Sequence, residues 1–86
     1  MAMIHLTIVT PDCKAFVGEV QRVIARTTGG DVCILPRHID YAAALGDGEA
    51  RFAISEKEIQ KARIQGGVMH VSKDHVQIVT DHFEWL

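Results

Sequence analysis

The sequence has no apolar segment long enough to cross a bilayer. Its longest apolar runs are a few residues, whereas a membrane-spanning helix needs roughly 20 consecutive apolar residues. No charged leader followed by an apolar stretch opens the chain. The sequence therefore predicts a soluble, cytosolic protein with no direct membrane insertion.

Cysteine is scarce, and charge of one sign is nowhere concentrated. Cys13 and Cys33 are the two cysteines, too few for a disulfide framework and too far apart for a CxxC motif, so we expect reduced thiols. Cys33 lies in an apolar run and is expected to pack as a small hydrophobic side chain, whereas Cys13 lies in a polar turn. The nine Lys and Arg residues are scattered, and this argues against nucleic-acid binding, which needs clustered cations.

Motifs that carry chemistry are also lacking. The sequence contains no HExxH, GxSxG or GxxxxGK[ST] pattern, and these are typical of zinc sites, hydrolases and nucleotide-binding loops. The five histidines lie on different predicted elements. His70 and His75 could meet across the turn at Lys73-Asp74, and a surface pair is favoured there over a zinc site. We predict no catalytic residue, no metal site, no cofactor and no nucleotide binding.

What the sequence does contain is a series of short runs rich in β-branched residues. In the first, Ile4, Leu6 and Ile8 alternate with other side chains and should share one face of a strand. At 86 residues the chain has room for one modest core, and turn formers recur about every ten residues, as in all-β sandwiches. The expected strands are Ile4 to Val9, Phe16 to Thr27, Val32 to Leu35, Tyr41 to Leu45, Ala50 to Ile54, Lys61 to Gln65, Val68 to Ser72 and His75 to Thr80.

Glycines and aromatic residues mark several special positions. Gly18 within the long second run indicates a bulge or a close backbone approach. Thr28-Gly29-Gly30-Asp31 and Gly66-Gly67 are turn signals, because glycine adopts positive φ without a steric cost. Phe83 and Trp85 follow the last expected strand, and we interpret them as core or partial core rather than as contact surface.

One segment has two interpretations. Ser55 and Glu58 have the spacing of a helix capping box, and local propensity favours a helix there. Against it, Ala62 and Ile64 alternate with polar residues, as in a half-buried strand. We predict a hairpin that turns near Glu56 to Glu58, with a short helix as the alternative.

In their order, these segments resemble a known family. The stretches that carry the resemblance are Leu6 to Asp12, Phe16 to Val20, Gly30 to His38, Leu45 to Gly48, Ala62 to Val71 and Val76 to Asp81. They are similar to the N-terminal domain of the ATP synthase epsilon subunit, over almost the whole chain. Two departures stand out: Asp40 occupies a place where the family usually has proline, and the sequence stops at Leu86, where most epsilon subunits continue into a helical hairpin.

The resemblance implies a flattened antiparallel β-sandwich of two sheets, one domain over residues 1–86, with the C-terminal helical hairpin domain absent. It implies a non-catalytic rotor part of the central stalk, peripheral at the cytoplasmic face of the membrane, that couples ion translocation to ATP synthesis. Without the hairpin, we expect no inhibition of ATP hydrolysis. Its implied partners are the c-subunit ring, through Gly29, Gly30 and Asp31, and the gamma subunit, through His38 and neighbouring loop residues. A small domain with this many hydrophobic residues should also leave some apolar surface uncovered, and we expect this gamma-facing side to include His38 and Tyr41.

Two other functions stay open at this point. A free-standing sandwich that binds a small ligand or an unrelated protein would share the fold but show no affinity for a gamma subunit. An enzyme would need a cleft with convergent titratable groups, and the sequence offers no candidate set.

Overall fold

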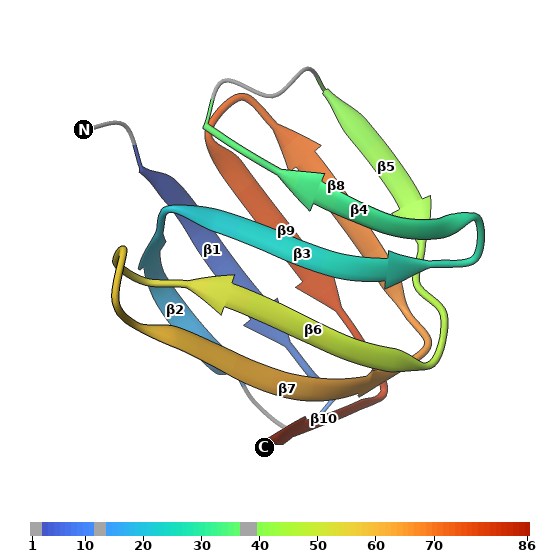
Figure 1. Ribbon diagram of the computed structural model, residues 1–86. Helices are drawn as coiled ribbons and strands as arrows, with labels where there is room; N and C mark the ends of the chain where they lie inside the picture. Colours follow the sequence, from blue (N-terminus) through green and yellow to red (C-terminus); the bar gives the residue numbers. More distant parts are fainter. Residues whose placement is uncertain (1–2, 12–13, 37–39) are drawn as a thin grey trace.

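The computed structural model describes residues 3–11, 14–36 and 40–86, and in this part of the chain ten strands form two sheets packed face to face (Figure 1). Sheet A has the order β2-β1-β9-β8-β5, and sheet B has the order β10-β7-β6-β3-β4. The predicted β-sandwich is therefore confirmed. Sheet A contains β1 (Ile4–Val9), β2 (Lys14–Val20), β5 (Tyr41–Ala44), β8 (Val68–Ser72) and β9 (His75–Val79). Sheet B contains β3 (Arg22–Thr27), β4 (Gly30–Ile34), β6 (Gly48–Ala53), β7 (Ile59–Gln65) and β10 (His82–Trp85).

One strand pair departs from the purely antiparallel arrangement that we expected. β1 runs parallel to β9, from His5 beside His75 to Val9 beside Val79, while the other pairs are antiparallel. Parallel neighbours need a long crossover connection, and here most of the chain, including four of the five strands of sheet B, lies between the two strands. The first and ninth strands thus meet in the centre of sheet A.

The core lies between the two sheets. Ile4, Leu6 and Ile8 are buried, as the alternation predicted, and Phe52 of β6 is the largest fully buried side chain. Because successive side chains of a strand point to opposite faces, the side chains between these buried positions point away from the other sheet. The buried core also includes Val20, Val23, Ala25, Ile34, Leu45, Ala50, Ala62, Ile64, Met69, Val71, Val76 and Ile78.

The long strand predicted over Phe16 to Thr27 is wrong, because the chain changes sheets within it. β2 ends at Val20 in sheet A, and β3 begins at Arg22 in sheet B. Between them, the backbone N–H of Gln21 donates to the carbonyl of Ala53, 2.6 Å away. Val20 and Val23 are both buried although they are three residues apart, so one strand could not place both side chains on the same face.

The predicted hairpin over Glu56 to Glu58 is confirmed. β6 and β7 pair from Gly48 beside Ile64 to Ala53 beside Ile59. The Ser55 hydroxyl accepts hydrogen bonds from the backbone N–H groups of Lys57 and Glu58. Helix propensity is overridden because burial of alternate β7 side chains rewards a strand.

Gly18 is close to another group, but the bulge lies elsewhere. The β1–β2 register shifts next to Ile8 and Val9, not at Gly18. A Cβ on Gly18 would lie 3.0 Å from the ring of Phe16, so this glycine leaves room for an aromatic side chain. Gly67 has a φ of 117°, and a Cβ there would overlap the carbonyl oxygen of Val79. The Gly66-Gly67 turn is therefore confirmed.

The C-terminal strand β10 was not predicted. It pairs with β7, and Phe83 packs against the core, as expected. Trp85 remains 41% exposed, with its ring edge-to-face against Phe16, Phe52 and Phe83. These four rings close one side of the sandwich. Over the described ranges, no helix has the length and apolar character to cross a membrane.

Candidate functional site

The outer side of sheet A is almost free of charge. On β1, β9, β8 and β5 its outward positions carry no Lys, Arg, Asp or Glu, and the charges of this face, Lys14 and Glu19, lie on the edge strand β2. Three outward valines are 47% to 53% exposed: Val17, Val68 and Val79. We call this surface the sheet A face. Its members are Lys14, Val17, Glu19, His5, Thr7, Val9, His75, Gln77, Val79, Val68, His70, Ser72, Ala42 and Ala44.

Three valines and an alanine of this face form a continuous row, and Val17 lies outside it, opposite Thr7. Val9 of β1 lies beside Val79 of β9, Val79 lies beside Val68 of β8, and Val68 lies beside Ala44 of β5. A small protein keeps single apolar side chains on its surface without consequence, but contiguous apolar patches mark interaction sites. The row therefore makes the sheet A face the leading candidate for a protein contact.

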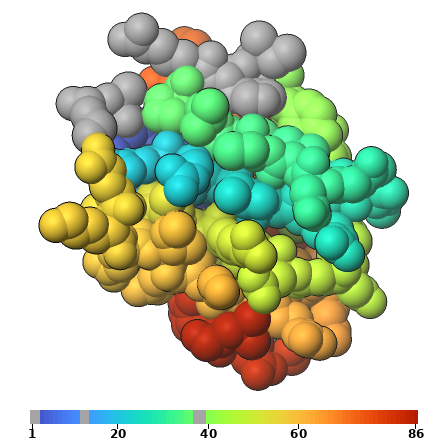
Figure 2. Space-filling view, in the orientation of Figure 1, coloured from blue at the N-terminus to red at the C-terminus, as the bar shows by residue number. Residues whose placement is uncertain are grey.

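The outer side of sheet B, formed by β3, β4, β6 and β7, faces the viewer in Figure 2. Its outward side chains are mostly charged. Five of the chain's nine Lys and Arg residues point outward here. Arg51 Nε donates to Glu49 Oε1 at 2.9 Å. We call this surface the sheet B face. Its members are Arg22, Ile24, Arg26, Asp31, Cys33, Glu49, Arg51, Ile59, Lys61, Arg63, Gln65, His82 and Glu84.

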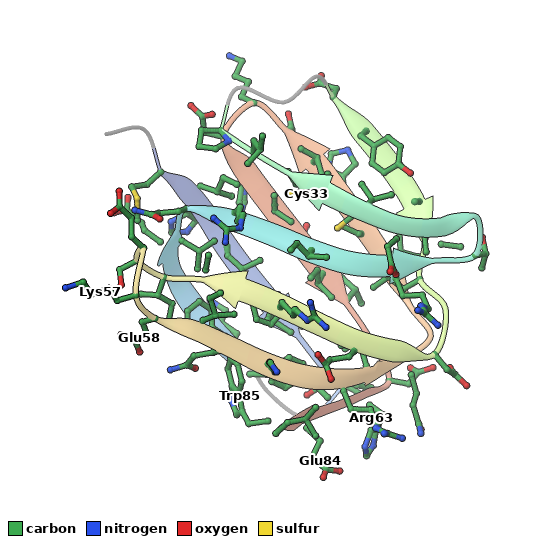
Figure 3. All side chains as sticks on the ribbon, in the orientation of Figure 1. Cys33, Lys57, Glu58, Arg63, Glu84 and Trp85 are labelled. Carbon is green, nitrogen blue, oxygen red and sulfur yellow. The ribbon has the colours of Figure 1, made fainter. Side chains whose placement is uncertain are left out.

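These charges perturb one carboxylate. The hydrogen bond from Arg51 lowers the pKa of Glu49, and the positive charges of Arg51, Lys61 and Arg63 act in the same direction. Arg63 lies in register between Glu49 and Glu84, and Figure 3 shows Arg63 and Glu84 pointing outward along β7 and β10. Exposed pairs of this kind contribute little to stability, so this face is typical of a solvated surface.

Cys33 belongs to the sheet B face, which corrects the prediction that it packs in the core. It is an exposed, free thiol, in agreement with the expected reduced state. Its β4 neighbour Ile34 is buried, and the alternation of the strand directs Cys33 to the other side. Cys13 lies outside the described residues.

The predicted ring contact lies at the tip of the β3–β4 hairpin, which we define as Thr27 to Asp31. Gly29, Gly30 and Asp31 are exposed there, and Gly30 has a φ of 124°. The Thr27 hydroxyl donates to the Gly30 carbonyl at 2.7 Å and accepts from the Gly29 N–H at 3.1 Å. The predicted turn at Thr28 to Asp31 is therefore confirmed, and the buried Thr27 side chain holds its backbone in place.

Asp31 has a partner that sequence reasoning missed. Arg26 Nε donates to Asp31 Oδ1 at 3.1 Å, and the two residues lie directly opposite each other on β3 and β4. Their equal distance from the two-residue turn is a signal that could have revealed the pair. A Cβ on Gly48 would lie 2.9 Å from Arg26 Cδ, so the arginine stem lies across this glycine.

The tip is also attached to the connection between β5 and β6. The Thr28 N–H donates to the Ala44 carbonyl, and the Gly46 N–H donates to the Arg26 carbonyl, each at 3.0 Å. Thr27 forms an isolated bridge with Leu45. The two loops therefore form one end of the sandwich, on the right in Figure 1.

Tyr41, a predicted gamma contact, begins the edge strand β5 beside Val71. Its side chain is half-buried and packs against the core, so it does not belong to the sheet A face. Nearby, the Lys73 N–H donates to Asp40 Oδ1 at 3.2 Å, and Lys73 has a φ of 55°. Asp40 thus caps the β8–β9 turn. His38, the other predicted gamma contact, lies outside the described residues.

The titratable side chains do not converge. Within the described ranges, no group of three or more His, Cys, Asp or Glu residues is placed to hold a metal ion. The ring of His75 packs edge-to-face against His5, rather than forming the expected pair with His70. An open groove of about 440 Å³ beside β7 is lined by Ile59, Gln60, Lys61, Trp85 and Leu86, and Lys61 is its one titratable side chain.

Comparisons with known proteins agree on one family. Residues 3–86 match the family model described as the β-sandwich domain of the ATP synthase delta/epsilon chain. The chain is 38% identical over 84 residues to the ATP synthase epsilon chain of Alkalihalophilus pseudofirmus, covering 98% of this chain and 62% of that one. It is 39% identical over 83 residues to the epsilon chain of Thioalkalivibrio sulfidiphilus, covering 94% and 59%.

Two solved structures share the fold. A chain in the Euglena gracilis mitochondrial ATP synthase, in its OSCP/F1/c-ring assembly, superposes with a TM-score of 0.92 at 24% identity, covering 99% of this chain and 54% of that one. A chain in the central stalk/c-ring assembly of the Tetrahymena thermophila enzyme gives a TM-score of 0.78 at 15% identity, covering 93% and 64%. The chain thus spans less than two thirds of the length of these relatives.

Proposed function

The chain belongs to the family of ATP synthase delta/epsilon-chain β-sandwich domains, and from this premise we propose that it is a non-catalytic part of the rotor. In this role it binds the gamma subunit through one side of the sandwich and the c-subunit ring through one end. It sits peripherally at the cytoplasmic face of the membrane and helps couple ion translocation to ATP synthesis. It needs no cofactor and no nucleotide of its own.

The observation that carries this proposal is the contrast between the outer sides of the two sheets. The sheet A face exposes Val17, Val68 and Val79 and confines its charges to one edge strand. The centre of a stable protein interface is depleted in charge and rich in apolar contacts. A gamma subunit seated on this face would cover the valines, leaving the charged sheet B face in solvent.

The ring contact rests on the tip. Asp31 is exposed and oriented by Arg26, and an ionised carboxylate forms strong hydrogen bonds with polar groups. The tip has few rotatable side chains and is attached to a second loop, so little conformational freedom is lost on contact. The two structural relatives come from assemblies named as containing a c-ring, which supports a ring contact for this chain.

Two affinity measurements test the proposal. The chain should co-purify with the gamma subunit of the same genome, and the resulting complex should retain the c ring in a pull-down. Asp31→Lys should weaken ring capture about tenfold or more, because it replaces the acceptor and places a second cation beside Arg26. Glu56→Lys is the matched control, since it makes the same charge change in the exposed β6–β7 turn, at the other end of the sandwich (Figure 1).

Each result has a defined reading. Gamma binding together with ring capture that Asp31→Lys reduces and Glu56→Lys does not would support both contacts. Equal ring capture by the two variants would contradict the tip as the ring contact. No gamma binding at micromolar concentrations would contradict the rotor assignment and favour a free-standing binding module.

A further inference from the structure

Histidine is the main ionisable residue of the sheet A face. His5, His70 and His75 point outward from β1, β8 and β9 and are exposed. His5 and His75 lie side by side in the parallel β1–β9 register, with ring centroids 5.2 Å apart and planes at 61°. The Thr7 hydroxyl lies 3.4 Å from His75 Nε2. The imidazoles thus lie where the other outward side chains of the central strands are uncharged.

Few charged groups surround this pair. On β2, Glu19 lies opposite His5; on β8, Ser72 lies opposite His75, and His70 lies opposite Gln77. Lys73 and Asp74 form the turn between β8 and β9, and the Asp74 carbonyl accepts a hydrogen bond from the His5 N–H at 2.7 Å. The charged and titratable groups on the neighbouring elements are therefore Glu19, His70, Lys73 and Asp74.

We propose that docking through the sheet A face is coupled to loss of protons from the His5–His75 pair, so that affinity falls as the solution becomes more acidic. This inference rests on the proposed function, because it takes the gamma subunit as the partner that covers the face. Imidazole is the side chain whose charge changes between about pH 5 and 8. Burying a charged group against an apolar partner is costly unless an opposite charge meets it.

The direction of the pH dependence follows from the two protonation states of the His5–His75 pair. Neutral rings at 5.2 Å pack edge-to-face, whereas two imidazolium rings at this distance repel each other. Glu19 can compensate one charge at the edge, but β9 and β8 offer no acidic side chain on this face. The docked state therefore favours the neutral pair, and an equilibrium that releases protons on docking weakens as pH falls.

Calorimetric titration of the gamma subunit with the full chain, from about pH 8 to about pH 6, tests this coupling. We expect the affinity of the native chain to fall about tenfold over this range, with net release of protons on binding. His5→Gln/His75→Gln should reduce the fall to about threefold or less. His82→Gln is the matched control, because it removes an exposed imidazole from the sheet B face and should leave the tenfold fall unchanged.

Different results would contradict the proposed function and the proton coupling. If the native chain binds gamma at no pH, the proposed function fails and the coupling with it. If it binds, but the double variant keeps the full pH dependence and the same proton release, the coupling alone is overturned. Both substituted rings are exposed, so the variants should fold, and circular dichroism at each pH checks this directly.

Discussion

The two outer faces of this sandwich are made by strands of similar length around one core, yet they differ in chemistry. The sheet B face carries five Lys and Arg residues and three acidic residues, while strands β1, β9, β8 and β5 of the sheet A face carry valine, alanine, threonine, glutamine, serine and histidine. Both faces leave apolar side chains exposed, with Val79 at 47% and Ile59 at 49%. Among the described residues, those of sheet A form a row across four strands, from β1 to β5, whereas Ile59 shares its groove with Trp85 and Leu86.

This difference shows that inward and outward positions of the strands meet different requirements. Inward positions of both sheets are apolar because the fold requires their burial, and this requirement is the same in sheet A and in sheet B. Outward positions are free of that demand, so their composition reflects what covers them. The charged composition of the sheet B face is typical of a surface that contacts water. The composition of the sheet A face, with few charges, is typical of a surface that contacts a protein partner.

The largest change in stability is expected from a substitution on the inward side of β9, compared with one on its outward side. Ile78→Ala, at a fully buried position of β9, should lower the free energy of unfolding by about 3 kcal/mol, since it leaves a cavity in the core. Val79→Ala, on the outward side, should lower it by less than about 0.5 kcal/mol. Urea unfolding of both variants measures this. Equal losses would mean that the valine row serves stability rather than contact.

The next prediction compares the two faces directly. Val79→Lys should weaken gamma binding about 100-fold, or about 2.7 kcal/mol, because it places a charge within the valine row of the proposed interface. Ile59→Lys is the matched control, with almost the same exposure on the sheet B face, and should change affinity less than about threefold. Surface plasmon resonance with immobilised gamma gives both values. Similar losses from both variants would contradict the assignment of one face.

The smallest expected effect concerns the charged face alone. The lowered pKa of Glu49, caused first by the Arg51 hydrogen bond, means that its carboxylate contributes stability at neutral pH. This contribution is present above the usual carboxyl range and is lost as pH falls through the lowered pKa, below about pH 4. Glu49→Gln should therefore be slightly less stable than the native chain at pH 7, and the difference should shrink as the pH falls below about 4. A difference that persists in acid would contradict this account.

Much of the fold could be predicted because inward side chains follow a simple period. The alternation of Ile4, Leu6 and Ile8 placed the first strand with its observed bounds, and the Gly66-Gly67 signal placed the turn into β8. The prediction of one long strand over Phe16 to Thr27 failed because we assumed that the same set of alternate residues faces inward along its whole length. Phe16, Gly18 and Val20 point inward at even positions, whereas β3 is buried at odd ones, and that shift marks where the chain changes sheets.

The candidate surfaces were harder to predict, since they depend on which strands become neighbours. Nothing local indicates that Val9, Val79 and Val68 form one row, because this requires the parallel β1–β9 pair. Tyr41 was expected on the apolar side, but the register of β5 directs it toward the core. By contrast, the tip was predictable, because its residues are contiguous and its glycines are turn formers.

A single NMR experiment can show which face of the sandwich meets the gamma subunit. Methyl NMR spectra of the isotope-labelled chain, recorded with and without the gamma subunit, report on both faces at once. The account predicts that methyl signals of Val17, Val68 and Val79 shift or broaden on binding, while those of Ile24 and Ile59 stay unchanged. Perturbation of the isoleucines with unmoved valines would place the partner on the charged face and contradict the account.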